Sequence, residues 1–519
     1  MLKILYFLDY GKQYGGAVHT IISQGLLMKK AGHQVHFFVS DYYGNEIEPI
    51  HLQICKENDI TLESVTYQMS SQPEDFDMVC LTKYYDALKE KILKYHPDIL
   101  HSVQINPMVE LIGRELSIPH IMNIYQLRAD FFELSYLDVF PHYHICDSWY
   151  WAKILHSYWN TEYTCIRTVS YLIQEENTHS NNNQEKVFKF ICAGSVCEEK
   201  NQLSVIKAVR ILRDNNVRLK LDIYGYNSGE YASECEHYIQ DHQLEDYVHL
   251  KGFVCDIWKR YSEYDALICG SKRESYPNVI SEALANKLVV ISTPVAGVPE
   301  VIVDRVNGFL TEDYSAEAIS DKLLEYIKFS SLGLLNRMIA NIETTYINTH
   351  SPERVEFELN KFYEYVIADN THSSNIGIED IHEQFQEEII TFERNRHKFQ
   401  NPSKVALKLW YLHYVKDNIH KNVADQCHFY IWGTGKASNA VDDIVTTFFP
   451  EVHIKGYVDS RKKGIHNDLP IYKPEQVIRN SKSVIIIAAV NGQYDMIDLL
   501  DKSGKIYNED YYIFSPRRW

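Results

Sequence analysis

Residues 268–310 read ICGSKRESYPNVISEALANKLVVISTPVAGVPEVIVDRVNGFL and decide how the rest of the chain is interpreted. The pattern predicts a buried strand end, a loop, a helix, a second apolar strand at 288–292 and a loop rich in glycine and proline. Pro277 suits the first turn of the helix, where its missing N–H would have no partner anyway. Glu274 precedes this helix and Glu282 lies inside it. Because the free N–H groups of a helix start favour an anion, the stretch predicts a phosphate site between two carboxylates that can bind sugar hydroxyls.

Seven residues separate these two carboxylates, and an isolated pair with this spacing is usually two solvated side chains. The surrounding residues favour a site, because the stretch resembles the retaining glycosyltransferases of family 4, which have the GT-B fold. The matching positions are Ser271, Glu274, Ser275, Tyr276, Pro277, Asn278, Glu282, Ala283, Ala285, Val289 to Ser292, Gly297, Glu300, Asn307, Gly308 and Leu310. The resemblance implies that Glu274 contacts hydroxyls of the donor sugar and that Glu282 contacts the ribose of the nucleotide. It also implies that the backbone from Ser275 to Val279 holds the diphosphate.

Length and composition favour a globular protein of several domains. With 519 residues, 45% of them hydrophobic and 24% charged, the chain is long enough for three domains with cores of their own. The formal net charge is −18 and no segment is rich in lysine and arginine, so we expect no nucleic-acid partner. The ten cysteines include no C-x-x-C pair, as expected in a reducing compartment.

The sequence also bears on location. No apolar run approaches the roughly 20 residues that a membrane-spanning helix needs. The first strand begins almost at Met1, without the features of a signal peptide. We therefore expect a cytoplasmic protein whose membrane contact is peripheral, at the inner face and through its acceptor.

Residues 1–175 alternate between apolar strands and periodic helices, which predicts a Rossmann-like domain. The resemblance implies that this domain lies on the acceptor side. Gly15 and Gly16 follow its first strand. They form either a plain tight turn or, as the resemblance implies, the place where the backbone approaches the donor diphosphate. His101 and Tyr125 stand near the ends of two later strands and are candidate acceptor-side residues, although the family often has histidine where this chain has Tyr125. A histidine at a strand end is structural about as often as it is functional.

Neither a metal nor a cofactor is expected. Asp75 and Asp77 form the D-x-D pattern that binds a metal in the other large glycosyltransferase fold. Here Pro73 precedes them in a polar loop, and no buried strand leads into the pair. We therefore interpret the two aspartates as part of a solvated turn, and we expect transfer without a divalent metal.

A polar, asparagine-rich linker at 175–186 leads into a second alternation of strands and helices, which predicts a second domain at 186–350. The resemblance implies that this domain binds the nucleotide sugar. The resemblance implies that Lys200 contacts the diphosphate, to which a compact ammonium group is suited. The family usually has an arginine where this chain has Ser195. Arg273 is our candidate for replacing that missing charge.

Two helical parts follow the second domain. Residues 351–370 form an amphipathic helix that, by the resemblance, crosses back to the first domain. Residues 371–425 are polar, with helical periodicity and no strand, which predicts a helical connector.

Residues 427–519 predict a small Rossmann-like domain with three recognisable strands. It resembles the modules attached to polysaccharide-biosynthesis enzymes. Gly433, Gly435 and Asp459 form a candidate second nucleotide site, with a phosphate at the helix start and a ribose hydroxyl on the aspartate. A lone glycine motif is weak evidence, and we favour a structural or assembly role for this domain.

The predicted fold is α/β with the GT-B architecture, in which two Rossmann-like domains face a cleft and a connector leads to the small third domain. We expect a retaining, metal-independent hexosyltransferase with Glu274 and Lys200 as catalytic residues. It would move sugar from a UDP- or GDP-sugar to a glycan or lipid-linked acceptor in surface polysaccharide or glycoconjugate synthesis.

The alternative is a degenerate homologue that acts as a scaffold subunit of a glycan-assembly complex. In either case the third domain is a candidate site for forming an oligomer or complex. An epimerase or a phosphorylase of the same fold is not favoured. We find neither the acidic and histidine residues that the first needs nor a lysine for the pyridoxal phosphate of the second.

Overall fold

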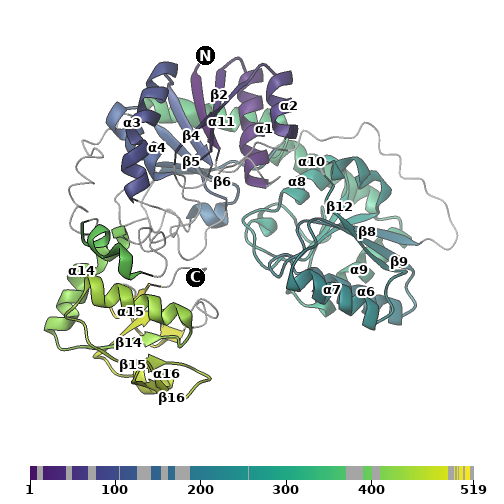
Figure 1. Ribbon diagram of the computed structural model, residues 1–519. Helices are drawn as coiled ribbons and strands as arrows, with labels where there is room; N and C mark the ends of the chain where they lie inside the picture. Colours follow the sequence, from purple (N-terminus) through teal and green to yellow (C-terminus); the bar gives the residue numbers. More distant parts are fainter. Residues whose placement is uncertain are drawn as a thin grey trace.

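The computed structural model contains three α/β domains, each built on its own sheet (Figure 1). It describes residues 1–8, 16–41, 49–67, 78–103, 106–125, 142–153, 162–169, 187–254, 256–369, 388, 390–399, 409–488, 496, 499–500, 502–506 and 509–514. Gly15, Asp75, Asp77 and the linker at 175–186 lie outside these ranges, so the predictions about them stay predictions.

The first domain is built on a seven-stranded parallel sheet with the order β3-β2-β1-β4-β5-β6-β7. The strands are β1 (Lys3–Leu8), β2 (Gln34–Ser40), β3 (Thr61–Val65), β4 (Ile99–Val103), β5 (His120–Asn123), β6 (Tyr143–Cys146) and β7 (Glu162–Cys165). The helices are α1 (Gly16–Lys30), α2 (Pro49–Glu57), α3 (Met78–Tyr95) and α4 (Pro107–Leu116). After Lys3, every residue of β1 is buried, as expected for a central strand covered by helices on both faces.

The second domain has a six-stranded parallel sheet with the order β10-β9-β8-β11-β12-β13. Its strands are β8 (Phe188–Ala193), β9 (Leu219–Tyr224), β10 (Val248–Gly252), β11 (Ala266–Cys269), β12 (Val289–Ser292) and β13 (Phe309–Leu310). Its helices are α6 (Gln202–Asp214), α7 (Glu230–Asp241), α8 (Asn278–Ala285), α9 (Ala316–Ser331) and α10 (Leu335–Thr349), with 3-10 turns η3 (Ile257–Glu263) and η4 (Val298–Glu300). The strand, loop, helix and strand expected within 268–310 are β11, its loop, α8 and β12.

Two glycines let the loops after β8 and β9 lie against each other. Gly194 and Gly225 have φ values of 141° and 152°, and a Cβ atom on Gly225 would lie 2.0 Å from the carbonyl oxygen of Gly194. Only glycine combines this backbone conformation with so close an approach. These two loops lie at the carboxyl ends of their strands, the edge at which open α/β sheets bind ligands.

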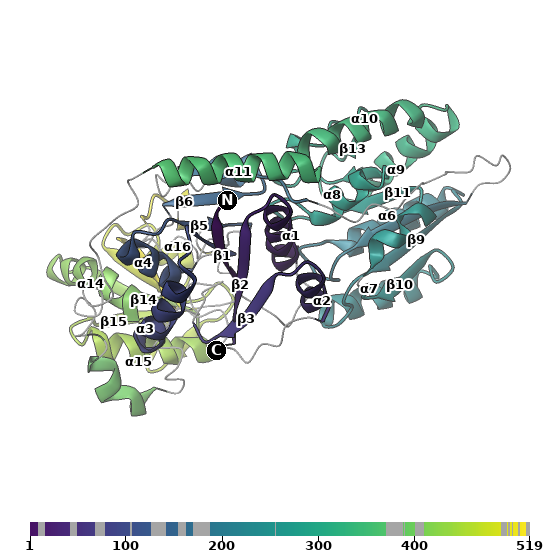
Figure 2. The ribbon, with the colours of Figure 1, turned by 90° about the horizontal axis from the view of Figure 1, so that it is seen from above.

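Helix α11 (Pro352–Ala368) returns from the second domain and lies along the first (Figure 2). Ser351 caps its N-terminus, where the Ser351 hydroxyl accepts a hydrogen bond from Arg354 N at 3.3 Å. The buried apolar residues of α11 belong to the same core as the first sheet. Its Tyr363 hydroxyl also lies 2.8 Å from the hydroxyl of Tyr6 on β1. The first and second domains are therefore joined twice, by the linker and by this helix.

The third domain follows helix α14 (Leu409–Ala424) and has the sheet order β16-β17-β15-β14-β18-β19. The three strands recognised in the sequence are β14 (His428–Trp432), β15 (Ile454–Val458) and β18 (Ser483–Ile487). The others, β16 (Gly464–His466), β17 (Leu469–Tyr472) and β19 (Tyr511–Ile513), have three or four residues each, too few for a periodic signal. The helices are α15 (Lys436–Phe448) and α16 (Pro474–Val477).

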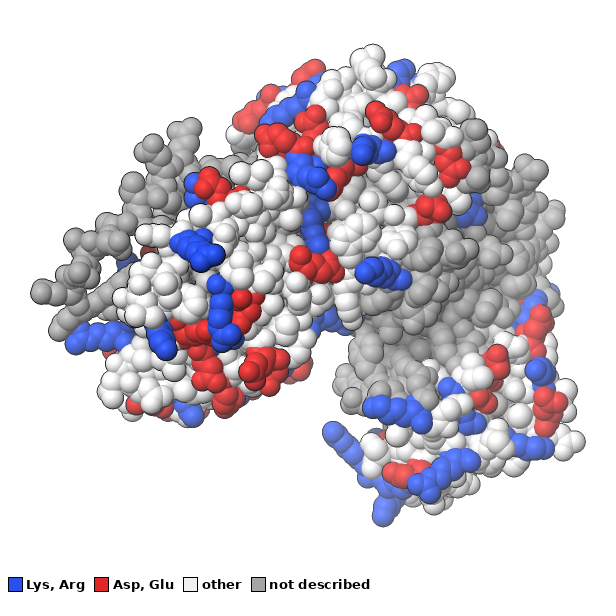
Figure 3. Space-filling model, turned by 180° about the vertical axis from the view of Figure 1, so that it is seen from behind, with Lys and Arg blue, Asp and Glu red and all other residues white. Residues whose placement is uncertain are grey.

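Charge is distributed unevenly over the surface. On the face shown in Figure 3, the second domain carries both acidic and basic side chains, with acidic ones grouped in its lower part, whereas lysine and arginine gather along the lower edge of the third domain. Exposed basic residues of the third domain include Arg461, Lys462 and Lys463. None of the helices within the described ranges is long and apolar enough to cross a bilayer.

Candidate active site

A cavity of about 380 Å³ lies between the first and second domains, at the carboxyl ends of their strands. The first domain lines it with Gly16, Ala17, His19, Thr20, Tyr125 and Asp147. The second domain lines it with Ala193, Gly194, Ser195, Lys200, Tyr224, Gly225, Tyr226, Phe253, Val254, Ile257, every residue from Glu274 to Val279, and Glu282. Most of the residues predicted from the sequence therefore meet at one place, although they come from opposite sides of the cavity.

Helix α8 directs its N-terminus at this cavity. Pro277 is the residue before the first helical turn, with φ −68° and ψ 120°, so the helix begins at Asn278, one residue later than the sequence suggested. Asn278 and Val279 line the cavity. Their N–H groups stand in the first turn, where no partner exists within the helix, and they carry the positive end of its dipole. This end of α8 can therefore bind an anion.

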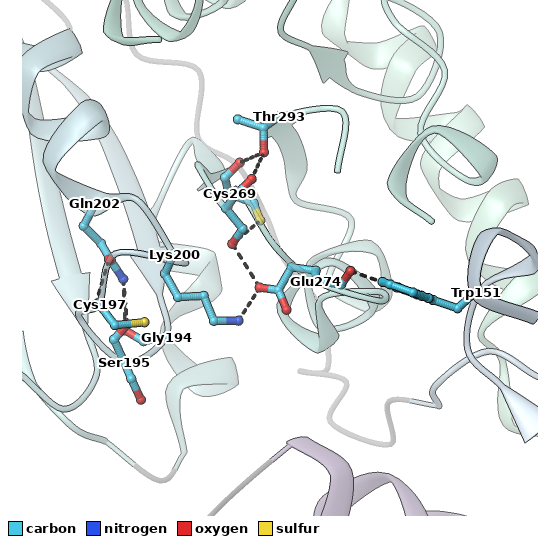
Figure 4. Close-up of polar contacts among 10 residues, drawn as sticks. Trp151, Gly194, Ser195, Cys197, Lys200, Gln202, Cys269, Glu274 and Thr293 are labelled. Atoms are coloured by element: carbon cyan, nitrogen blue, oxygen red, sulfur yellow. Dashed lines mark hydrogen bonds and ion pairs between the residues drawn. The ribbon is translucent and has the colours of Figure 1, made fainter. Parts of the chain in front are cut away.

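Lys200 and Glu274 form an ion pair inside the cavity (Figure 4). Glu274 Oε1 also accepts a hydrogen bond from Ser271 Oγ at 2.9 Å, and the Glu274 carbonyl accepts one from Trp151 Nε1 at 3.2 Å. Burial alone would lower the pKa of Lys200, but the charge of Glu274 and their hydrogen bond raise it. The lysine is therefore a fixed cation, held beside the start of α8 where an anion would be bound.

Glu282 lies on α8 and also faces the cavity. Its Oε2 atom accepts a hydrogen bond from the hydroxyl of Tyr261 at 2.7 Å. Burial raises the pKa of Glu282 to about 7, although the Tyr261 hydroxyl opposes this shift. The Tyr261 hydroxyl therefore orients this carboxyl group, whose oxygens can accept a further hydrogen bond from a hydroxyl of a ligand.

Gly16 brings the first domain into contact with α8. Asn278 Nδ2 donates to the carbonyl of Gly16 at 3.1 Å and lies 3.3 Å from Thr20 Oγ1. A Cβ atom on Gly16 would lie 2.8 Å from Asn278 Nδ2. A larger residue at position 16 would therefore displace the Asn278 side chain from the hydrogen bond that joins the starts of α1 and α8.

Asp147 was missed by the sequence analysis. It follows β6, is 3% exposed and lines the cavity from the first domain. Its Oδ1 atom accepts a hydrogen bond from Ser275 Oγ of the second domain, and its carbonyl accepts one from Arg167 Nη1 at 2.6 Å. Burial raises the pKa of the Asp147 carboxyl to about 7. The available signal was a polar residue directly after the buried strand YHIC, at the edge where ligands bind.

Two predicted site residues do not face the cavity. His101 is completely buried in the first sheet, with Nδ1 2.7 Å from the Tyr363 hydroxyl and Nε2 3.0 Å from Asn123 Oδ1. Burial lowers the pKa of His101 to about 3, so the ring is neutral. Arg273 is not a lining residue, and its guanidinium lies 4.0 Å from Glu199. The placement of both residues argues against the roles predicted for them, whereas Tyr125 does line the cavity.

In the third domain, the candidate ligand-binding residue Asp459 already accepts hydrogen bonds from neighbouring residues. Asp459 Oδ2 accepts a hydrogen bond from Thr434 Oγ1 at 2.6 Å, and Oδ1 accepts from the N–H groups of Arg461 and Lys462 at 2.8 Å each. Burial would raise the pKa of Asp459, but these hydrogen bonds, Thr434 first, lower it. The carboxylate therefore fixes the glycine loop of Gly433 and Gly435, which fits a structural role better than a free ribose acceptor.

A second set of contacts joins the first and second domains beside the cavity. Glu300 of the second domain accepts hydrogen bonds from Trp149 N at 2.9 Å and Tyr150 N at 2.7 Å, at the start of helical residues 149–153. The same carboxylate pairs with Arg167. This contact, the Glu300 latch, caps a helix of one domain with a side chain of the other.

Gly297→Ala is expected to open this interface. A Cβ atom at Gly297 would lie 2.4 Å from Cβ of Ser148 in the first domain and 3.0 Å from the Ser275 carbonyl. The Ser148 atom is fixed by the backbone of the first domain, so the domains must separate, and overpacking of this kind costs about 1–3 kcal/mol. Urea unfolding should show this loss of stability. An unfolding free energy equal to that of the wild type would contradict the close contact.

Among the described residues, no group of three or more histidine, cysteine, aspartate or glutamate side chains is arranged to hold a metal ion. The Asp75–Asp77 pair lies outside those residues. Whether the reaction needs a metal therefore stays a prediction.

Comparison with known proteins agrees with this geometry. Residues 173–345 match the family model for Glycosyl transferases group 1. The GtfA subunit of a UDP-N-acetylglucosamine–peptide N-acetylglucosaminyltransferase of Streptococcus pneumoniae is 32% identical over 139 residues, 27% of either chain. The poly(glycerol-phosphate) alpha-glucosyltransferase of Bacillus subtilis is 24% identical over 195 residues, 37% of this chain and 29% of that one. The chain thus spans less than a third of the length of these relatives.

The group 1 match covers the whole cavity-lining part of the second domain, and the predicted resemblance to these glycosyltransferases is confirmed. Solved structures extend it to the fold. A glycosyltransferase from Rickettsia africae superposes with a TM-score of 0.59 at 17% identity, covering 71% of this chain and 99% of that one. Anabaena HepE in complex with UDP gives 0.57 at 16% identity, covering 70% and 100%. The first two domains have the GT-B fold, as predicted, while membership of family 4 within the group stays a prediction.

Proposed function

We propose that this group 1 glycosyltransferase is a retaining, metal-independent enzyme. It would transfer a sugar from a nucleotide-sugar donor to a glycan or lipid-linked acceptor, in the synthesis of a surface polysaccharide or glycoconjugate. The observation that carries this proposal is the Lys200–Glu274 pair beside the N-terminus of α8, inside a cavity that both domains line. A UDP-sugar is tried first, since HepE was solved with UDP and UDP-glucose.

The proposed chemistry is electrostatic. As the bond from the anomeric carbon to the diphosphate breaks, negative charge grows on the departing phosphate. Lys200 and the first N–H groups of α8 stand where they can stabilise it without reorganising. Glu274 would orient the sugar hydroxyls and Glu282 the ribose. In the front-face route that gives retention, the acceptor hydroxyl approaches the anomeric carbon from the side of the leaving diphosphate. The diphosphate then accepts the proton of that hydroxyl.

The test is a screen of UDP-glucose, UDP-N-acetylglucosamine and GDP-mannose for thermal stabilisation and nucleotide release. Transfer to a glycan acceptor, followed by NMR of the anomeric proton of the product, then reports retention or inversion. A chain that binds a donor but never releases nucleotide, with any acceptor, would instead be the scaffold subunit considered above.

Transfer is expected to survive chelation. This expectation rests on Lys200 and the first N–H groups of α8, which can donate hydrogen bonds to a diphosphate in the cavity without a divalent cation. Activity measured in EDTA should stay within about twofold of the untreated value, a difference below 0.5 kcal/mol. Complete loss in EDTA with recovery in Mn²⁺ or Mg²⁺ would bring Asp75 and Asp77 back into consideration.

The third domain would bind the partner that carries the acceptor. Its glycine loop is held by Asp459, and its exposed lysines and arginines suit an acidic surface. Co-sedimentation of the full chain with anionic vesicles tests peripheral membrane contact, and light scattering tests a homo-oligomer.

A further inference from the structure

The cavity holds more negative than positive charge. Among its described lining residues the carboxyl groups are Asp147, Glu274 and Glu282, whereas Lys200 is the single lysine or arginine. Lys200 already pairs with Glu274. His19 adds no charge near neutral pH, because burial lowers its pKa to about 4. A nucleoside diphosphate would bring further negative charge into this site.

Asp147 is the carboxyl group for which this conflict is most direct. Its Oδ1 atom is bound by the side chain of Ser275, whose backbone belongs to the proposed diphosphate site. Among the described residues, the side-chain hydrogen bond to this carboxyl group reaches Oδ1, and Asp147 lines the cavity, so Oδ2 can face a ligand. Because Asp147 is 3% exposed, water cannot screen an anion here as it would at the surface. An ionised Asp147 would therefore repel a phosphate held at the start of α8.

We propose that Asp147 binds the donor diphosphate as a neutral carboxylic acid, donating a hydrogen bond from Oδ2 to a phosphate oxygen. This inference rests on the donor site proposed above and adds a residue to it from the opposite domain. It implies that a protein molecule whose Asp147 is ionised before binding takes up one proton from solvent when it binds the nucleotide diphosphate. No covalent bond is made or broken in this step.

The charged and titratable groups around Asp147 allow this protonation near neutral pH. Those that influence its carboxyl, or are influenced by it, are Arg167, Glu274, Tyr125, Cys146, Cys165 and Tyr276. Burial raises the pKa of Asp147 to about 7, the hydrogen bond from Ser275 and the charge of Arg167 oppose the rise, and Glu274 adds to it. Arg167 also forms an ion pair with Glu300. Because Glu300 neutralises part of its charge, Arg167 stabilises the ionised form of Asp147 less. A bound diphosphate would raise this pKa further.

The experiment is calorimetric titration of UDP into the wild type and Asp147→Asn. Each titration is run in phosphate and in Tris, whose different ionisation enthalpies report protons exchanged. Wild-type affinity for UDP should fall as pH rises above 7, by up to about tenfold per pH unit. Asparagine imitates the neutral acid, so Asp147→Asn should bind UDP at least as tightly at pH 8.5 and take up fewer protons. The phosphate groups of UDP also exchange protons on binding, and this contribution cancels when the proton uptake of Asp147→Asn is subtracted from that of the wild type.

Two controls isolate the carboxyl and the phosphate. Uridine lacks the diphosphate, so its binding to the wild type should show no such proton uptake, and this comparison needs no variant. Glu312→Ala removes an exposed carboxylate of the second domain that does not line the cavity, so it should keep the difference between UDP and uridine.

The inference is overturned if UDP and uridine show equal proton uptake with the wild type. It is also overturned if Asp147→Asn melts like the wild type but binds UDP with unchanged pH dependence or much more weakly at every pH. If neither UDP, GDP nor ADP binds the wild type, the proposed donor site itself fails, and the inference with it.

Discussion

Lys200→Met is expected to lower kcat for sugar transfer about 100- to 1,000-fold, the loss typical when a fixed charge that stabilises the transition state is removed. The ammonium stands beside the start of α8, where the departing diphosphate is proposed to lie. Its removal also leaves Glu274 as an unpaired carboxylate in a partly buried site, which adds repulsion toward the donor. Initial rates with a UDP-sugar, measured at several donor concentrations, give kcat and KM separately.

Lys272→Met is the matched control. Lys272 lies two residues before Glu274 and is exposed, and it is not a lining residue of the cavity. Its replacement removes the same charge and should change kcat by no more than about twofold, as surface substitutions usually do. Equal losses in the two variants would mean that the overall charge of the domain matters and that the position of Lys200 does not.

Much of the second domain could be predicted from the sequence, because its site is local. The segment from Ser271 to Glu282 carries a loop, a helix start and both carboxylates, and its resemblance to the glycosyltransferases implied that they surround one site. The alternation of buried strands and helices likewise indicated the two large sheets, since parallel strands covered on both faces are apolar throughout.

The missed parts depend on contacts between residues far apart in the chain. Asp147 acquires its role from Ser275, 128 residues later, and nothing near it in the sequence reports that meeting. His101 was assigned to the acceptor side because it matches a position that is often histidine in the family, although a histidine at a strand end is structural about as often as functional. The helix that crosses back supplies Tyr363, which binds the ring and buries it. In each case the deciding partner comes from another domain or a distant helix.

The short strands of the third domain illustrate a different limit. Strands β16 and β17 form an antiparallel hairpin whose turn holds Asn467 and Asp468 at φ values of 45° and 61°. Both residue types tolerate this left-handed conformation, which two-residue hairpin turns require. Asn467 and Asp468 could therefore have predicted the hairpin turn, whereas the strands on either side are too short for an alternating pattern to be recognised.

Glu300→Ala is expected to lower the free energy of unfolding by about 2–3 kcal/mol. Removing one partner of a buried ion pair typically costs 3–5 kcal/mol, and we discount this because the Glu300 side chain is 23% exposed. The substitution leaves Arg167 without its carboxylate and removes the acceptor of the Trp149 and Tyr150 N–H groups. Urea unfolding, followed by tryptophan fluorescence, measures the change.

The same variant should weaken UDP binding, because the Glu300 latch holds the first domain against the donor site. Arg167 also donates to the carbonyl of Asp147, so loosening it displaces the first-domain side of the cavity. If the joined arrangement becomes only fractionally populated, the apparent dissociation constant rises in inverse proportion to that fraction. Small-angle scattering should then show a larger radius of gyration for Glu300→Ala without ligand, and recovery of the wild-type value at saturating UDP.

Two further variants separate charge, geometry and non-specific effects. Glu300→Gln keeps a carbonyl oxygen that can accept from one backbone N–H group, so its loss of stability should lie between those of alanine and the wild type. Glu312→Ala removes an exposed carboxylate from the same domain and should change the unfolding free energy by less than about 0.5 kcal/mol. If Glu300→Ala unfolds and binds UDP like Glu312→Ala, the contacts of Glu300 do not hold the two domains together, and the approach of the first domain must depend on α11 and the Asp147–Ser275 hydrogen bond.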